Sequence, residues 1–163
     1  MKISTMHIQW QYGLLKNSLL SVKHILQMTP AEQLTSFRDG GTGWTVTEVL
    51  CHLRDFEDVF YVRAQMTINE KLAELPFPDP DQQAIDNRYA EQDPHEVYAT
   101  WASYRERFLG FLQERTEDEW KRVAIHPKRG KFTLYDQLML TPWHDVNHLE
   151  QITRILAEQK LGG

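Results

Sequence analysis

The chain has 163 residues, a formal net charge of −5 and charged side chains at 25% of its positions. This length suits one domain with a substantial hydrophobic core, and the acidic balance gives no basic surface for nucleic acid. No apolar run is long enough to cross a bilayer, and the N-terminal residues lack the pattern of a cleavable signal. Cys51 is the only cysteine, which agrees with a reducing compartment. We therefore expect a cytoplasmic protein, a single domain over residues 1–163, with no nucleic-acid or membrane partner.

The first part of the chain contains two helical patterns. Residues 5–28 place apolar side chains at intervals of three and four, which predicts an amphipathic helix that ends before Pro30. The stretch "RDGGTG" (38–43) is typical of a loop. Thr45 and Glu48 have the spacing of a capping box, so a second helix is expected to begin there and to run to about residue 68.

The second part of the chain begins with a long connection over residues 71–93, which contains three prolines in "LPFPDPD". Asp93 and Pro94 then predict the start of a third helix that reaches about residue 115. Two β-prone runs around a Pro-Lys-Arg-Gly turn predict a small hairpin, and a fourth helix follows to about residue 159. The fold class is therefore predicted to be all-α: a four-helix bundle with a long crossover between its second and third helices and a small hairpin before the fourth.

Three histidines occupy positions that should face the core of this bundle. His144 and His148 lie four residues apart, on the same face of the fourth helix. His52 falls on the apolar stripe of the second helix, between Val49 and Phe56. Three imidazoles can hold a divalent transition metal and leave a coordination position open. The alternative is that each is an ordinary core histidine bonded to a backbone carbonyl, and periodicity alone does not decide between the two.

Two stretches, "GWTVTEVLCHLRDFED" (43–58) and "GKFTLYDQLMLTPWHDVNHLEQI" (130–152), resemble the DinB-like family of bacterial metal-binding helical bundles. In that family a Trp-Ser/Thr pair opens the second helix, a His-Leu pair follows, and a His-Asp-x-x-His-x-x-Gln-Ile run lies on the last helix. The resemblance covers nearly the whole chain and implies that His52, His144 and His148 are metal ligands. For three imidazole ligands we expect zinc or nickel as the ion. Pro142 departs from the pattern, since proline removes a helical hydrogen bond and can kink the helix.

Other residues have simpler interpretations. "HDVNH" is similar to the zincin pattern His-Glu-x-x-His, but the shorter Asp145 replaces the glutamate and no histidine follows among residues 149–163. Asp145 is expected either to support a ligand ring or another helix, or to be exposed. Cys51 is interpreted as a structural thiol, and Trp44 and Trp143 as packing residues. His126 is expected to be an exposed loop histidine, with a place at the pocket mouth as the alternative.

Three functions follow from these observations. The first is a metal-dependent enzyme that acts on small molecules as a hydrolase or a thiol transferase. The resemblance implies a low-molecular-weight thiol such as bacillithiol or mycothiol as cosubstrate, and it also implies a homodimer. The second is a non-catalytic metal-binding stress-response protein, in which the ion joins two helices. The third is a helical bundle that binds no metal and acts by association.

Overall fold

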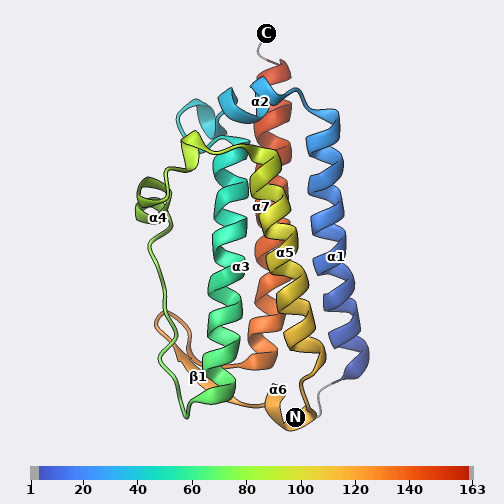
Figure 1. Cartoon of the computed structure of the whole chain (residues 1–163), viewed down its shortest axis with the longest axis vertical. Helices are drawn as coiled ribbons and strands as arrows, with labels where there is room; N and C mark the ends of the chain where they lie inside the picture. The colour runs from blue at the N-terminus through green and yellow to red at the C-terminus, as the bar shows by residue number, and fades with distance from the viewer. Residues whose placement is uncertain (1–3, 162–163) are drawn as a thin grey trace.

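The computed structural model describes residues 4–161, and four long helices that run side by side dominate it (Figure 1). These helices are α1 (Thr5–Met28), α3 (Val46–Asn69), α5 (Pro94–Gln113) and α7 (Leu134–Leu161). Each helix turns its apolar stripe inward, where the stripes bury one another. The predicted all-α four-helix bundle is confirmed.

Side-chain caps fix where two of these helices begin. The Oγ1 atom of Thr45 accepts a hydrogen bond from the backbone N–H of Glu48 at 3.2 Å, and the Glu48 carboxylate accepts one from the backbone N–H of Thr45 at 2.7 Å. Asp93 caps α5 in a similar way, with Pro94 at the first helical position. Because these caps satisfy amides that the helix leaves free, both helices begin where the sequence predicts.

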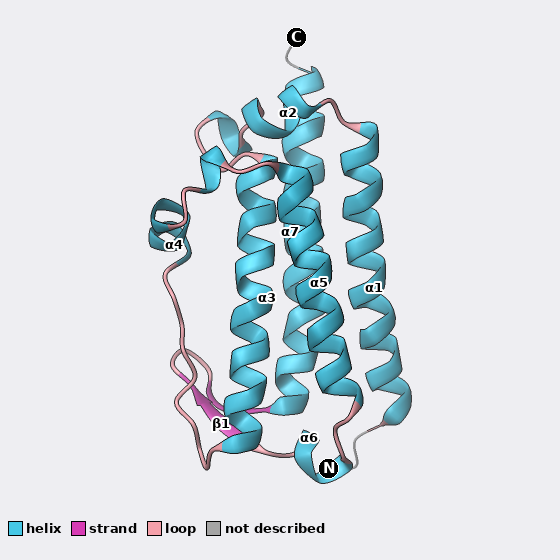
Figure 2. Ribbon diagram, viewed as in Figure 1, coloured by secondary structure: helices cyan, strands magenta, loops and turns pink. Residues whose placement is uncertain are grey.

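The connection between α3 and α5 crosses the outside of the bundle and contains short helical segments that the sequence pattern does not predict (Figure 2). These are α4 (Pro80–Asp86) and the 3-10 turn η2 (Tyr89–Glu91). The buried Tyr89 donates a hydrogen bond to the Asp55 carboxylate at 2.7 Å, which attaches this crossover to α3. Three further short elements are α2 (Ala31–Ser36), η1 (Asp39–Gly41) and α6 (Glu117–Trp120).

The predicted hairpin is present at one end of the bundle. Its strands are β1 (Val123–His126) and β2 (Gly130–Thr133), paired antiparallel, and Gly130 adopts the left-handed backbone conformation that the turn requires. The backbone of Ile125 exchanges hydrogen bonds with the segment after α3: it donates to Ala73 at 2.8 Å and accepts from Leu75 at 2.9 Å. The hairpin is therefore attached to the start of the crossover as well as to α7.

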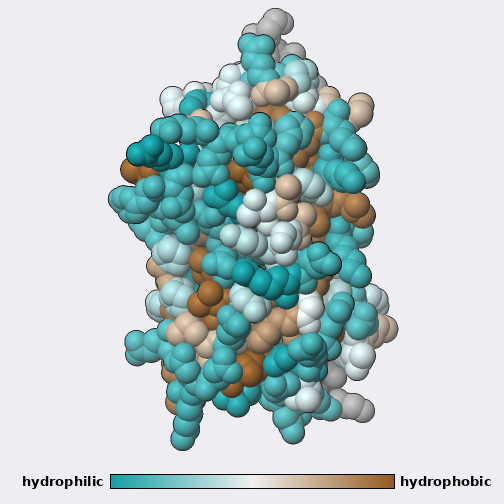
Figure 3. Space-filling model, viewed as in Figure 1, coloured by the Kyte–Doolittle hydropathy of each residue, from teal (hydrophilic) through white to brown (hydrophobic). Residues whose placement is uncertain are grey.

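Helix α7 continues through Pro142 from Leu134 to Leu161, so this proline does not end the helix. The face shown in Figure 3 is largely hydrophilic, with hydrophobic residues in small separate groups. Among residues 4–161, no helix combines the length and the apolar character that crossing a membrane requires.

Candidate metal centre

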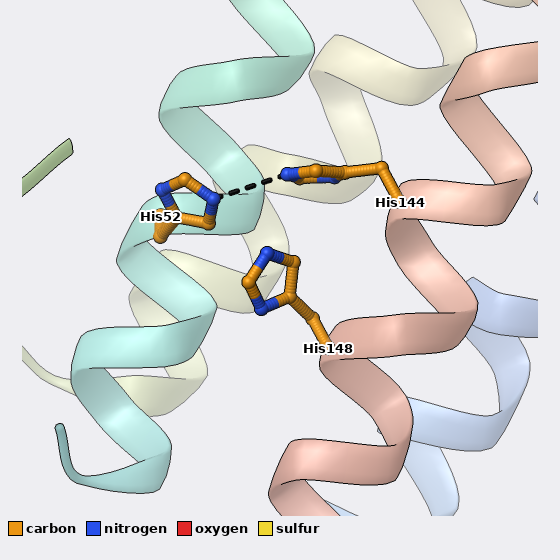
Figure 4. Close-up of side chains that lie close together, drawn as sticks. All are labelled: His52, His144 and His148. Carbon is orange, nitrogen blue, oxygen red and sulfur yellow. Dashed lines mark hydrogen bonds between the residues drawn. The ribbon is translucent and has the colours of Figure 1, made fainter. Parts of the chain in front are cut away.

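Three imidazoles meet between α3 and α7 (Figure 4). His52 comes from α3, and His144 and His148 come from successive turns of α7. One ring nitrogen from each histidine can be chosen so that all three lie within 4.8 Å of one another, and the Nε2 atoms of His52 and His144 are 3.0 Å apart. Two imidazole nitrogens on one tetrahedral ion are separated by about 3.3 Å, given ordinary metal–nitrogen bond lengths. The spacing of the cluster is therefore close to that of a single-ion site.

The environment keeps these imidazoles neutral. Burial, with the neighbouring His148, lowers the pKa of His52 to about 3. Burial also lowers the pKa of His144 to well below its ordinary value, with His148 and His52 adding to the shift. The pKa of His148 is lowered by burial, although its hydrogen bond to Gln151 opposes the shift. A neutral imidazole offers one nitrogen lone pair, which is the form that binds metal ions.

A hydrogen-bond chain sets the orientation of His148. Its Nδ1 atom lies 2.9 Å from Oε1 of Gln151, one turn further along α7, and the Gln151 amide nitrogen donates to the Asp39 carboxylate at 2.9 Å. Because that carboxylate can only accept, the amide oxygen of Gln151 must face His148. Nδ1 of His148 then carries the proton, and its Nε2 lone pair is free for a metal ion.

The other two histidines show why the donor set fits a cation. Their Nδ1 atoms are enclosed and find no hydrogen-bond partner among the described residues, while their Nε2 atoms face each other. Between two neutral rings, one Nε2 must donate and the other must accept, so one of the facing nitrogens gives up its lone pair to a proton. A shared cation instead takes both Nε2 lone pairs. The residues present therefore fit a divalent transition metal.

The histidines line a pocket with a volume of about 340 Å³. Its walls are largely aromatic and include Trp44, Phe56, Phe60, Phe77 and Trp143. Trp143 is 61% exposed and Phe77 is 39% exposed, so both lie at the rim and the pocket opens to solvent. The prediction that Trp143 packs inside the protein is thus wrong: it follows the buried Pro142 on α7 but points out of the bundle.

Three basic side chains also line this pocket: Arg63, His126 and Arg129. The expectation of an exposed His126 is wrong, because the docked hairpin leaves this residue only 2% exposed at the end of β1. Arg63 is not predicted from the sequence, where it resembles a surface charge on an amphipathic helix. The hairpin and the crossover cover it, and that arrangement depends on contacts between distant parts of the chain.

Asp145 lies beside His144 in sequence but points to a different part of the core. Its carboxylate accepts a hydrogen bond from the Ser18 hydroxyl at 2.6 Å and pairs with Arg105 at 2.8 Å, and Arg105 also pairs with Glu57 at 2.6 Å. Burial raises the pKa of both carboxyl groups, and Arg105 opposes that shift. Asp145 therefore supports other helices, one of the expected roles, and does not take the place of a zincin base.

Cys51 is separate from the pocket, as its position on α3 predicts. The thiol is fully buried, 3.9 Å from the backbone oxygen of Tyr89, and burial raises its pKa to about 12. Such a thiol is unreactive at neutral pH, which agrees with a structural role.

The fold and this site define a helical-bundle protein with a three-histidine cluster in an open pocket. The family model of the DinB superfamily matches residues 18–152, and the chain belongs to this family. The resemblance found in the sequence is thereby confirmed.

Individual relatives agree with this assignment. A protein of Oceanobacillus iheyensis named "Putative metal-dependent hydrolase" is 29% identical over 145 residues, covering 87% of this chain and 77% of the relative. A Bacillus subtilis protein named "Putative metal-dependent hydrolase YfiT" is 30% identical over 131 residues, covering 78% of this chain and 71% of the relative. The solved structure of YfiT, a four-helix bundle, superposes with a TM-score of 0.87 at 25% identity, covering 97% of this chain and 90% of that one. A mycothiol-dependent maleylpyruvate isomerase shares the fold, with a TM-score of 0.72 at 14% identity over 95% of this chain and 71% of that one.

Proposed function

We propose that this protein is a metal-dependent enzyme that acts on small molecules, with His52, His144 and His148 as the ligands of one divalent transition-metal ion, zinc or nickel. The observation that supports it most is the convergence of three neutral imidazoles in a pocket that opens to solvent. A structural metal site is normally closed by a fourth protein ligand, whereas a catalytic site keeps a position open. Among the described residues, the metal-binding group contains these three histidines and no further carboxylate or thiolate.

The reaction that we propose first is hydrolysis. When bound, a divalent ion would supply Lewis acidity and lower the pKa of a coordinated water or thiol. The chain's own residues supply the rest: the Gln151 amide holds the His148 ring, and Phe56 and Phe60 pack against the His144 ring at centroid distances of 5.5 and 5.2 Å. These aromatic contacts keep the rings in place and make the surroundings of the site apolar. The two relatives that carry the name "Putative metal-dependent hydrolase" support this choice.

Thiol transfer is the second candidate. The mycothiol-dependent isomerase that shares this fold uses a small thiol, and the pocket here has room for a small molecule beside the histidines. In this reaction the S–H bond of the thiol would break and its sulfur would form a bond to an electrophilic carbon of the substrate. The bond from that carbon to its leaving group would break, and the leaving group would take up the proton through the solvent. Cys51 cannot supply this thiol, because it is fully buried outside the pocket, so a free cosubstrate is needed.

Metal content tests the ligand set. We expect the purified protein to hold about one divalent ion per chain after dialysis against a weak chelator, and His52→Ala, His144→Ala and His148→Ala each to lose it. His24→Ala is the matched control, because His24 is an exposed histidine on α1. Unchanged metal content in the three cluster variants would rule out the proposed ligands.

Turnover tests the reaction. A panel of esters and amides, and a separate panel of thiols with a small electrophile, should include a substrate that the metal-loaded protein converts and that His148→Ala does not. If the metal is bound and no member of either panel reacts faster than in the variant, the non-catalytic metal-binding function is favoured instead.

A further inference from the structure

Arg63 is a buried cation whose hydrogen bonds are incomplete. The residue is 2% exposed on α3, and its Nε atom donates to the backbone oxygen of Pro76 at 2.9 Å. Its Nη2 atom is enclosed and has no hydrogen-bond partner among the described residues. A charged donor that is buried without a partner lowers the stability of the folded protein. In a pocket, a bound ligand can supply the missing acceptor.

Among residues 4–161, no carboxylate fills this role. Among the side chains that the structure describes, none of the ion pairs includes Arg63, Lys128 or Arg129. Burial, with the neighbouring charge of Arg129, lowers the pKa of Arg63 to about 10, so the guanidinium is still protonated at neutral pH. This side of the pocket therefore carries positive charge, and the described part of the chain supplies no counter-ion to it.

His126 adds a second donor to the same wall. Its Nδ1 atom accepts a hydrogen bond from the backbone N–H of Lys128 at 3.1 Å, which leaves the ring proton on Nε2. Burial lowers the pKa of His126, and so do Arg63 and Arg129, so the ring is neutral near pH 7. The imidazole lines the pocket and has an N–H to offer.

Two phenylalanines connect this wall to the histidine cluster. The Cζ atom of Arg63 lies 5.7 Å from the ring centroids of both Phe60 and Phe77. The Phe60 ring is also 5.2 Å from the His144 ring. One aromatic side chain thus separates the basic wall from the histidine cluster, and the surface between them is apolar.

We propose that Arg63, assisted by His126 and Arg129, binds the carboxylate of the substrate, so that the enzyme selects small molecules with an apolar body and one anionic end. This proposal rests on the proposed function for the reaction, but the anion site consists of different residues. In it, the apolar body lies along Phe60 and Phe77, and the reacting group faces the histidines.

A carboxylate suits these donors better than a phosphate does. A planar guanidinium pairs with the two oxygens of a carboxylate, and one buried guanidinium balances a single negative charge. A phosphate monoester is close to a dianion at neutral pH and has three acceptor oxygens, and only one guanidinium in this wall is buried. Arg129 is exposed, so its contribution is weakened by solvent.

Binding of matched small molecules tests the proposal. The probes are 3-phenylpropionate, the neutral 3-phenylpropionamide and phenyl phosphate, each titrated calorimetrically into the full chain with its metal and after metal removal. We expect the carboxylate to bind about tenfold or more tightly than the amide, because a charge-assisted hydrogen bond is lost in the amide. We expect this preference to persist after metal removal. Because the carboxylate then has no ion to bind, a remaining preference must come from the basic side chains.

Variants assign the preference to Arg63. Arg63→Met keeps most of the side-chain volume and should bind acid and amide equally, while Arg63→Lys should recover part of the difference. Arg107→Met is the control, because Arg107 lies on α5, pairs with Asp58 and does not line the pocket. If Arg63→Met does not fold, the wild-type comparison of acid and amide is decisive, and Arg129→Gln should reduce the preference without removing it.

Three results would overturn the proposal: equal binding of acid and amide by the wild type, a preference for the acid that survives in Arg63→Met, or tighter binding of phenyl phosphate. Failure of the proposed function gives a different result. If the chain holds no metal but still prefers the acid, the proposed function is wrong and the anion site is retained. If the chain holds metal but does not prefer the acid, the anion site is wrong.

Discussion

Asp145 and Arg105 form a 2.8 Å ion pair between α7 and α5, and the two side chains are 2% and 1% exposed. Glu57 of α3 joins the same guanidinium at 2.6 Å, and Nη1 of Arg105 donates to the backbone oxygen of Leu15 in α1 at 2.7 Å, so one arginine connects all four long helices. Since Asp145 directly follows His144, this buried network also fixes the stretch of α7 that presents the histidine.

We expect Arg105→Met to lower the free energy of unfolding by about 3–5 kcal/mol, because it leaves two carboxylates in the core without their cation. Urea denaturation measures this free energy, and the comparison is valid if the m-value is the same in the variant and the wild type. The exposed pair of Arg107 and Asp58 gives the comparison: Arg107→Met should cost at most about 1 kcal/mol. If the free energy of unfolding falls equally in the two variants, the buried network stabilises the fold no more than the exposed pair does.

A second prediction concerns Gln151, which accepts from Nδ1 of His148 at 2.9 Å and is itself held by Asp39. Gln151→Ala should weaken metal binding by about 10- to 100-fold while the fold remains, since residues that orient a ligand ring have effects of this size. Competition with a chromogenic chelator measures the affinity. Gln113→Ala, at an exposed position near the end of α5, should leave it unchanged. An unaltered affinity in Gln151→Ala would mean that the ring is oriented by packing alone.

The sequence predicted those parts of the site that depend on local periodicity. His144 and His148 share a helical face because of their spacing, and His52 lies on an apolar stripe, so their inward direction follows from helix geometry. The capping box at Thr45 and Glu48 placed the start of α3 for the same reason: all its hydrogen bonds are made within four residues. Only the resemblance to a family, however, indicated that the three rings share one ion.

The remaining wall of the pocket could not be predicted, because it depends on contacts between distant segments. Phe77 and His126 meet at a centroid distance of 5.4 Å only because the hairpin pairs with the segment after α3. Arg105 and Glu57 are 48 residues apart and resemble the charges of a solvated helix face until α3 and α5 pack together. Charged residues are seldom buried unless paired, and a sequence does not show the pairing.

Oligomeric state is a third prediction: we expect a homodimer. Met6, Trp10 and Leu14 lie four residues apart on α1 and are 53%, 58% and 44% exposed, which leaves an apolar strip on the outside of the bundle. Light scattering at micromolar concentration should give twice the chain mass. Trp10→Glu should shift the protein toward monomer if this strip is the contact, whereas Trp143→Glu, at an exposed tryptophan of the pocket rim, should not. A monomer mass for the unaltered chain would refute the prediction.

The last prediction is the pH dependence of stability in the metal-free protein. The folded chain holds His52 with a pKa of about 3 and His144 with a pKa well below its ordinary value, while both titrate near 6.5 in the unfolded chain. Below about pH 6.5 the unfolded state therefore binds protons that the folded state does not, and the free energy of unfolding falls as the pH falls. The expected slope is about 1.4 kcal/mol per pH unit for each histidine that remains unprotonated.

Urea unfolding between pH 7.5 and 5, with and without metal, measures this slope. His52→Gln removes one titrating group and should make the dependence shallower by about 1.4 kcal/mol per pH unit, whereas His24→Ala on the exposed face of α1 should not change it. The difference between variant and wild type isolates the histidine from the buried carboxyl groups of Glu57 and Asp145, whose raised pKa values act in the opposite direction. Metal affinity should decline over the same range, because protons compete for the imidazole lone pairs. If the slope is the same in His52→Gln as in the wild type, folding does not lower the pKa of His52 and the prediction is wrong.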